Sequence, residues 1–170
     1  VHSPGMTWTA IVPLKPPGSR KTRLSERLDP MARNALSEAL FAHVIGVLSR
    51  HRAIDDLRTL SPVPPPGAGL WHADEGRGLN PELGALRARL EGRNLLVVHA
   101  DLPLIDESDI DALIMAADDA DIVVAPDRAG LGTNALCVRA GVPFTFHFGP
   151  DSLARHRETP GCRVTMVDRP

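Results

Sequence analysis

Short apolar runs alternate along this chain with longer stretches in which apolar residues recur every three or four positions. The short runs fit buried strands, whereas the longer repeats fit helices that lay one face on a sheet. Strands are predicted at residues 8–14, 56–60, 70–73, 94–100 and 121–125, and helices at 30–49, 80–90 and 109–117. This alternation predicts an α/β domain with a mostly parallel sheet and helices on both faces.

The predicted helices carry more detailed expectations. Asn80 and Pro81 supply the start of the second helix. The proline- and glycine-rich segment 62–69 predicts an irregular connection, because neither residue type continues a helix or a strand well. The apolar positions expected to face the sheet from the first helix are Leu36, Leu40, Val44, Val47 and Leu48.

Composition fits one compact domain. Of 170 residues, 43% are hydrophobic and 24% are charged, and no shift in composition divides the chain. Residues 1–5 precede a methionine without any pattern and are interpreted as the remnant of an expression tag, which leaves a domain over 6–170.

Charge and cysteine content exclude several classes of partner. A formal net charge of -2 argues against sequence-independent binding of nucleic acid. Cys137 and Cys162 lack metal-ligand spacing, so reduced thiols and a cytoplasmic location are expected. No apolar run approaches the ~20 residues of a membrane-spanning helix, so no membrane partner is expected.

Asp101 directly follows the most apolar predicted strand. The carboxyl ends of parallel strands form the usual ligand crevice of such sheets. Because Mg²⁺ prefers one or two carboxylates together with phosphate oxygens, Asp101 is the first candidate metal ligand. A turn or cap beside Pro103 is the competing interpretation. The later acidic run at 106–111 is expected only to cap and solvate a helix.

A cationic loop follows the first predicted strand. It contains Lys15, Arg20, Lys21 and Arg23, whose charges could neutralise a triphosphate and a departing pyrophosphate. A solvated basic turn explains the same cluster. The loop is not a P-loop, because the required glycine and lysine spacing is absent.

Two loops of small residues could seat anions. One holds Gly130, Gly132, Thr133 and Asn134, and an ordinary turn would look similar. In the second, Ser152 follows a glycine near the start of a predicted helix, and a simple helix cap by Asp151 explains that loop equally well. Together with the cationic loop and Asp101, these loops favour phosphate chemistry.

These segments resemble the CofC/FbiD family of guanylyltransferases of coenzyme F420 biosynthesis. The resemblance extends from Ala10 to about Asp168. Its blocks are the Pro-Leu-Lys opening with 21–24, then 78–80, 100–104, 125–136, and 148–156. It implies a single-domain, MobA-like nucleotidyltransferase fold related to the Rossmann type. It also implies GTP as donor, Mg²⁺ as cofactor and a small phosphorylated carboxylic acid as acceptor.

The resemblance also implies roles for individual residues. It places Thr133, Gly149 and Ser152 at the acceptor and Asp101 on the metal. Further roles are inferred here: donor phosphates at Lys15, Lys21 and Arg23, the nucleoside along Leu14 and Gly78, Leu79 and Asn80, and the junction of the two substrates at Asp127, Arg128 and Asn134.

The acceptor phosphate would attack the α-phosphorus of GTP in line, so positioning of two anions matters more than a general base. His156 is therefore expected to be structural or to support a neighbouring group. For the acceptor, 2-phospho-L-lactate is favoured over phosphoenolpyruvate and 3-phospho-D-glycerate. A homodimer is left open.

One feature departs from the family pattern, and two alternatives follow. Family members continue into an Asp-x-Asp-Thr-Pro segment that completes the metal site, whereas this sequence stops at Pro170. The first alternative is another nucleotidyltransferase, of the molybdenum-cofactor or sugar-nucleotide type, which would want a Gly-Gly-rich first loop. The second is a GTP-binding module without catalysis.

Overall fold

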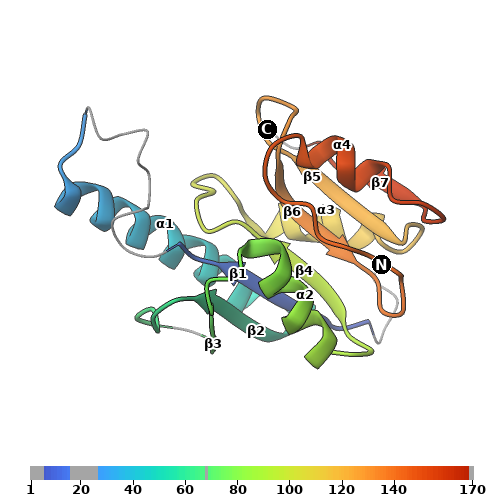
Figure 1. Cartoon of the computed structure of the whole chain (residues 1–170), viewed down its shortest axis with the longest axis horizontal. Coiled ribbons are helices and arrows are strands. Elements are labelled where there is room, and N and C mark those ends of the chain that lie inside the picture. The colour runs from blue at the N-terminus through green and yellow to red at the C-terminus, as the bar shows by residue number, and fades with distance from the viewer. Residues whose placement is uncertain (1–5, 16–26, 68, 169–170) are drawn as a thin grey trace.

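The described residues form one seven-stranded sheet with helices on both sides (Figure 1). The computed structural model describes residues 6–15, 27–67 and 69–168. The strands are β1 (Trp8–Pro13), β2 (Ile54–Ser61), β3 (Leu70–Ala73), β4 (Asn94–Val98), β5 (Ile122–Pro126), β6 (Thr133–Val138) and β7 (Val164–Met166). The helices are α1 (Pro30–Arg50), α2 (Leu79–Arg89), α3 (Glu107–Ala116) and α4 (Ser152–Arg157).

The sheet has the order β3-β2-β1-β4-β6-β5-β7, and β6 is antiparallel to both of its neighbours. The other pairings are parallel, which confirms the predicted mostly parallel α/β sheet. The strand order reverses direction between β1 and β4. In open α/β sheets such a reversal is where a crevice opens at the carboxyl ends of the strands.

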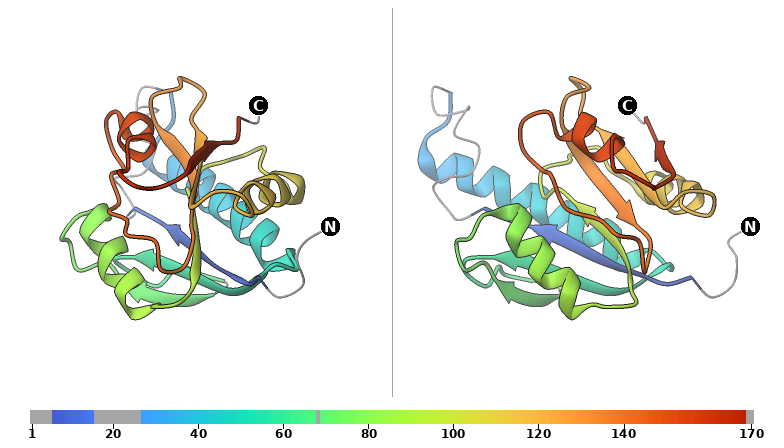
Figure 2. Two further views of the ribbon diagram at one scale, coloured as in Figure 1. Left: turned by 90° about the vertical axis from the view of Figure 1, so that its right-hand side faces the viewer. Right: turned by 45° about the vertical axis from the view of Figure 1, so that its right-hand side comes forward.

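Two apolar layers cover the sheet. Trp8, Ala10 and Val12 pack under α1 and α3, while Ile11 packs on the other face with Leu83 and Leu86 of α2. This alternation along β1 is the period of two that a strand imposes. The edge-on view in Figure 2 shows α1 and α3 on one side of the sheet and α2 and α4 on the other. None of the helices in the described part of the chain combines the length and apolar character needed to cross a membrane.

The buried face of α1 differs from the predicted one. Leu36 is 36% exposed and Leu40 is only partly buried, whereas the buried positions are Ser37, Phe41, Val44, Ile45, Val47 and Leu48. The predicted apolar stripe was wrong by one position near the start of the helix. There the sheet-facing side is occupied by the small polar Ser37, which a pattern of apolar residues cannot detect.

The first turns of α2 and α3 can be compared with the helix starts predicted from the sequence. Helix α2 begins after Gly78, whose φ of 98° lies in the left-handed region, and Asn80 does not cap it. The predicted start at Asn80 and Pro81 was therefore wrong. In α3, Asp106 accepts a hydrogen bond from the backbone N–H of Asp109, and the Asp109 side chain accepts one from Asp106, which forms a capping box. The expectation that this acidic run caps a helix is confirmed.

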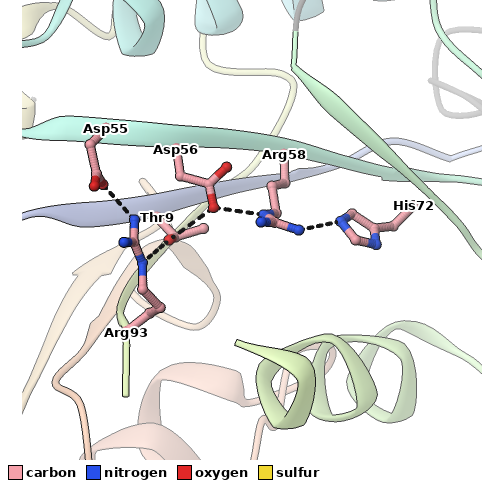
Figure 3. Close-up of polar contacts among 6 residues, drawn as sticks. All are labelled: Thr9, Asp55, Asp56, Arg58, His72 and Arg93. Carbon is pink, nitrogen blue, oxygen red and sulfur yellow. Dashed lines mark hydrogen bonds and ion pairs between the residues drawn. The ribbon is translucent and has the colours of Figure 1, made fainter. Parts of the chain in front are cut away.

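A polar network ties β1, β2 and β3 together (Figure 3). The buried Thr9 hydroxyl accepts a hydrogen bond from Arg93 Nε at 3.0 Å and donates one to Asp56 Oδ2 at 3.3 Å. Arg58 extends the network by donating to Asp56 at 2.8 Å and to His72 Nε2 at 2.9 Å. Each member satisfies a partner, so the network can be buried at little cost.

Candidate functional site

A cavity of about 360 Å³ opens at the carboxyl ends of β1 and β4, where the strand order reverses. Because β6 is antiparallel, its first residues lie at the same edge. The residues of the sequence-based hypothesis that line this cavity are Leu14, Lys15, Asp101, Asp127, Thr133, Asn134, Gly149 and Ser152. The structure thus brings together segments that are more than a hundred residues apart in the chain.

Other residues of the hypothesis are not among the residues lining this cavity. Gly78, Leu79 and Asn80 lie at the start of α2, and Arg128 is exposed in the turn between β5 and β6. Lys21 and Arg23 fall outside the described residues, as does the segment 1–5 interpreted as a tag remnant. The roles predicted for these residues stay predictions.

Asn80 does not line the cavity but holds the backbone of Phe148, which does. Its side-chain N–H donates to the Phe148 carbonyl at 2.9 Å, and its Oδ1 accepts from the Phe148 N–H at 2.7 Å. This amide therefore fixes the segment leading into Gly149, which lines the cavity. The loop before α2 is itself fixed by buried Glu82, which accepts hydrogen bonds from the backbone N–H groups of Glu75 and Arg77. The Arg77 guanidinium beside Glu82 lowers the pKa of that carboxyl.

His99, which directly follows β4, lies between the charged residues of the cavity. Burial lowers its pKa, the Asp101 carboxylate opposes this shift, and the Lys15 ammonium adds to it. Both charges are therefore close to the same imidazole. The ring also contacts Phe148 edge to face, with centroids 5.2 Å apart. The cavity is therefore lined by a cation and a carboxylate that both act on a half-buried histidine.

Asp127 organises the loop between β5 and β6. Its Oδ1 accepts a hydrogen bond from the Leu131 N–H at 3.0 Å, and its backbone N–H donates to the Gly132 carbonyl at 2.9 Å. Hydrogen bonds from the amides of Gly132 and Leu131 lower the pKa of this carboxyl. A Cβ atom at Gly132 would lie 2.6 Å from Asp127 Oδ2, so a larger residue there would displace this carboxylate. Asp127 thus shapes the cavity wall with a carboxylate that remains ionised.

Two buried hydroxyls, those of Thr133 and Ser152, also line the cavity, and the buried His156 imidazole lies behind them. Ser152 Oγ donates to Thr133 Oγ1 at 3.2 Å, and Thr133 Oγ1 lies 3.0 Å from His156 Nδ1. The backbone N–H of His147 donates to His156 Nε2 at 3.0 Å. Burial, with a smaller effect of the neighbouring His147, lowers the pKa of His156 to about 4. The histidine is therefore neutral near pH 7.

A strained turn carries Ser152 into the cavity. Gly149 has a φ of 122°, which favours glycine, and Asp151 has a φ of 55° in the left-handed region. Asp151 precedes α4, but its side chain makes no capping hydrogen bond. The alternative that this loop is a simple cap by Asp151 was therefore wrong. Backbone strain of this kind persists where the surrounding structure demands it.

Several residues on the cavity were not anticipated from the sequence. The residues that line the cavity but were assigned no role from the sequence are Pro13, Ser37, His99, Ala100 and Phe148. His99 stands two positions before Asp101 and could have been found by extending the strand-end argument to its neighbours. Ser37 and Phe148 come from a helix and an irregular segment, where no local pattern marks a binding residue.

The described residues contain no group of three or more His, Cys, Asp or Glu side chains that could hold a metal ion. Asp101 is exposed at the cavity and offers one carboxylate. Mg²⁺ commonly takes one or two protein carboxylates and completes its shell with water and substrate phosphates. The donor set therefore fits a magnesium ion that arrives with a nucleotide, rather than a metal held by protein ligands alone.

Known proteins similar to this chain are guanylyltransferases. Residues 8–164 match the family model described as guanylyl transferase CofC like. A phosphoenolpyruvate guanylyltransferase of Sphaerobacter thermophilus is 38% identical over 164 residues, covering 89% of this chain and 78% of the relative. A 2-phospho-L-lactate guanylyltransferase of Methanopyrus kandleri is 32% identical over 160 residues, covering 92% of this chain and 80% of the relative.

A solved structure shows the same fold at much lower sequence identity. It comes from Desulfovibrio desulfuricans G20 and is provisionally described as a nucleotide-diphospho-sugar transferase. It matches with a TM-score of 0.75 at 16% identity, covering 96% of this chain and 80% of that one. This likeness concerns the fold alone and agrees with the predicted single-domain nucleotidyltransferase architecture.

Proposed function

The chain belongs to the guanylyl transferase CofC-like family of nucleotidyltransferases, and from that membership we propose that it joins GMP from GTP to a small phosphorylated carboxylic acid. Pyrophosphate is the second product. The observation that carries the proposal is the shared cavity, which is lined by a cation and a carboxylate together with two buried hydroxyls and a glycine. The proposal also assigns this reaction to coenzyme F420 biosynthesis, as the family resemblance implies.

The donor lies at the Lys15 and Asp101 end in this proposal. The Lys15 ammonium would attract the phosphates of GTP, and Asp101 would hold a magnesium ion that arrives with the nucleotide. That ion supplies charge stabilisation for the departing pyrophosphate. Lys21 and Arg23 would add cations to the same end of the substrate.

The acceptor lies at the Thr133, Gly149 and Ser152 end. A hydroxyl and the backbone beside a glycine can donate hydrogen bonds to phosphate or carboxylate oxygens without bulky side chains between them. Thr133 and Ser152 are 5% and 1% exposed, so the bonds that they donate form in a site largely free of water. Asp127 and Asn134 line the wall between the two ends.

The proposed reaction is an in-line displacement. An oxygen of the acceptor phosphate forms a bond to the α-phosphorus of GTP, while the bond from that phosphorus to the bridging oxygen of the β-phosphate breaks. The electron pair leaves with pyrophosphate. Since the attacking phosphate is already ionised near pH 7, the site needs no strong base. The protein contributes positioning and the neutralisation of two anions that repel each other.

We propose phosphoenolpyruvate as the first acceptor to test. The relative named for it is 38% identical, whereas the relative named for 2-phospho-L-lactate is 32% identical. This ranks the acids differently from the sequence-based preference for 2-phospho-L-lactate. The candidate acids differ by a few atoms, and discrimination on that scale is worth ~1–3 kcal/mol.

The test measures pyrophosphate release with GTP, Mg²⁺ and each of the three phospho-acids, beside a control with GTP alone. It uses this chain and a chain extended past Pro170 by the segment that the family resemblance implies. Release that depends on one acid supports the proposal and identifies the acceptor. Release that no acid stimulates in either chain contradicts it.

A variant separates the two ends of the cavity. Ser152→Ala removes one buried hydroxyl, so we expect the KM for the phospho-acid to rise about 10-fold, with little change in the KM for GTP. Steady-state kinetics with each substrate varied in turn provides the measurement. Equal losses for both substrates would place Ser152 elsewhere than at the acceptor.

A further inference from the structure

His156 is buried on the far side of the two cavity hydroxyls and does not line the cavity itself. Its side chain is 0% exposed. Phe148 contacts the ring edge to face with centroids 5.0 Å apart, and Phe144 lies tilted at 5.7 Å. Both of its ring nitrogens are within hydrogen-bond distance of a neighbour. The ring is thus held in one place and one orientation.

The hydrogen bonds also determine which ring nitrogen carries the proton. The backbone N–H of His147 can only donate, so His156 Nε2 must be the accepting, unprotonated nitrogen. In a neutral imidazole the proton then sits on Nδ1. That Nδ1–H lies 3.0 Å from Thr133 Oγ1 and donates to it.

The direction of the Thr133 hydroxyl follows from this. Its oxygen accepts from His156 Nδ1 and from Ser152 Oγ, which occupies both lone pairs. The hydroxyl hydrogen of Thr133 is then left to donate, and no hydrogen bond from it to another described residue is present. If the two hydroxyls exchange roles, the hydrogen left over belongs to Ser152. Either way one O–H remains for a ligand in the cavity that both residues line.

We propose that His156 is a positioning residue that fixes the hydroxyls of Thr133 and Ser152 as a donor to an anionic oxygen of the acceptor. The inference rests on the proposed function, because it concerns the acceptor end of that site. The His147 N–H determines which nitrogen of the His156 ring carries the proton, and that ring orients the Thr133 hydroxyl. The pair of hydroxyls then faces the ligand. An acceptor oxygen that carries negative charge is favoured, because a hydrogen bond from this O–H to an ionised oxygen is stronger than one to a neutral oxygen.

The main test replaces His156 with phenylalanine, which keeps a ring but removes both nitrogens. We expect the KM for the phospho-acid to rise about 10-fold while the KM for GTP changes less than 2-fold. The His156→Gln variant keeps a donor and an acceptor and is expected to recover part of the loss. The matched control is His51→Phe, since His51 is also buried but binds Asp111, away from the cavity. A general effect of losing a buried histidine would appear in the control as well.

A double-mutant cycle shows whether His156 acts through Thr133. In a Thr133→Val background the hydroxyl is absent, so adding His156→Phe should raise the KM for the acid less than 2-fold further. If the two changes instead multiply, His156 acts independently of Thr133 and the inference is wrong.

The ring tautomer is measured on the wild-type chain and needs neither turnover nor a stable variant. Nitrogen NMR of ¹⁵N-labelled histidine near pH 7 is expected to show His156 protonated on Nδ1 and unprotonated on Nε2. Protonation of Nε2 would overturn the inference. The two proposals fail differently: absent turnover in the wild type contradicts the proposed function, whereas normal turnover with the wrong tautomer contradicts only the role of His156.

Discussion

At the scale of single residues, Asp101 is a position where a substitution is expected to change catalysis without changing the stability of the fold. Its side chain is exposed at the cavity, and the apolar layers of the sheet do not depend on it. We expect Asp101→Asn to lower metal-dependent turnover on the order of 100-fold or more, because the proposed magnesium ligand is lost.

The measurement for Asp101 is turnover across a Mg²⁺ titration, combined with the thermal midpoint of the variant. Asp118→Asn is the matched control, since Asp118 is exposed just beyond α3. Turnover of Asp101→Asn equal to that of the control would remove Asp101 from the metal site.

His156 predicts a pH dependence of stability. In the unfolded chain the pKa of this histidine is near 6.5, whereas burial in the folded chain lowers the pKa to about 4. The unfolded state therefore takes up more protons in this window, and stability falls as the pH drops. Between pH 7 and pH 5 the expected loss is about 2 kcal/mol.

Urea unfolding at both pH values measures this loss, with His156→Gln for comparison because glutamine does not titrate. His99 contributes in the same direction, since burial also lowers its pKa. The His156→Gln variant is therefore expected to keep a part of the pH dependence. An identical pH dependence in wild type and variant would show that His156 does not titrate as expected.

At the scale of elements, the turn before α4 is where backbone conformation and binding meet. Gly149→Ala puts a side chain at a φ of 122°, although no atom lies within 4 Å of the new methyl group. The expected effect is backbone strain of about 1–3 kcal/mol, with a raised KM for the phospho-acid.

Gly84→Ala is the matched control for the glycine variant. Gly84 lies within α2, and a methyl group there would also meet no atom within 4 Å. It should stabilise the fold by about 0.5–1 kcal/mol, because alanine favours a helix more than glycine does. If Gly149→Ala left both the stability and the KM for the phospho-acid unchanged, the turn would be free to adopt another conformation.

The same scale shows how far the sequence predicts this fold. The predicted strands and helices are all present, because the strands are short apolar runs and the helices carry apolar residues every three or four positions. Strands β6 and β7 were not predicted, and the glycine-rich entry of β6 with Thr133 and Asn134 was interpreted as a loop. Its antiparallel insertion beside β4 depends on pairing across the sheet, which a local pattern does not contain.

The candidate site was predictable where the chemistry follows a strand. Asp101 and Lys15 were found because charged residues after apolar runs are conspicuous. His156 was expected to be structural or supporting, and its hydrogen bond to Thr133 agrees with that expectation. Its two specific partners could not be predicted, since they come from segments that are adjacent only after folding.

At the scale of the whole molecule, two buried threonines on neighbouring strands test the network in Figure 3. Thr9 is 0% exposed and bonds to Arg93 and Asp56, whereas Thr59 is 1% exposed and its hydroxyl has no partner among the described residues. Thr9→Val should destabilise the fold by about 1–2 kcal/mol, because it leaves polar partners unsatisfied.

Thr59→Val is the matched change and should be neutral or stabilising, since it removes a buried hydroxyl without a partner. Thermal and urea unfolding of both variants provide the comparison. Equal destabilisation would mean that the shape of threonine, rather than the network, matters at these positions.

The arrangement of the whole sheet gives the account its central claim. The reversal between β1 and β4 lies at one cavity, and antiparallel β6 brings Thr133 and Asn134 to the same edge as Lys15 and Asp101. The central claim of the proposal is that an oxygen of the acceptor phosphate attacks GTP in this cavity, so the acceptor phosphate keeps all of its oxygens in the joined product.

The most direct test follows the atoms of the acceptor phosphate. The protein is incubated with GTP, Mg²⁺ and the active phospho-acid labelled with ¹⁸O in its phosphate, and both products are examined by mass spectrometry. The account predicts that the guanylylated acid carries all of the label and pyrophosphate carries none. Label in pyrophosphate, or hydrolysis of GTP without a joined product, would contradict it.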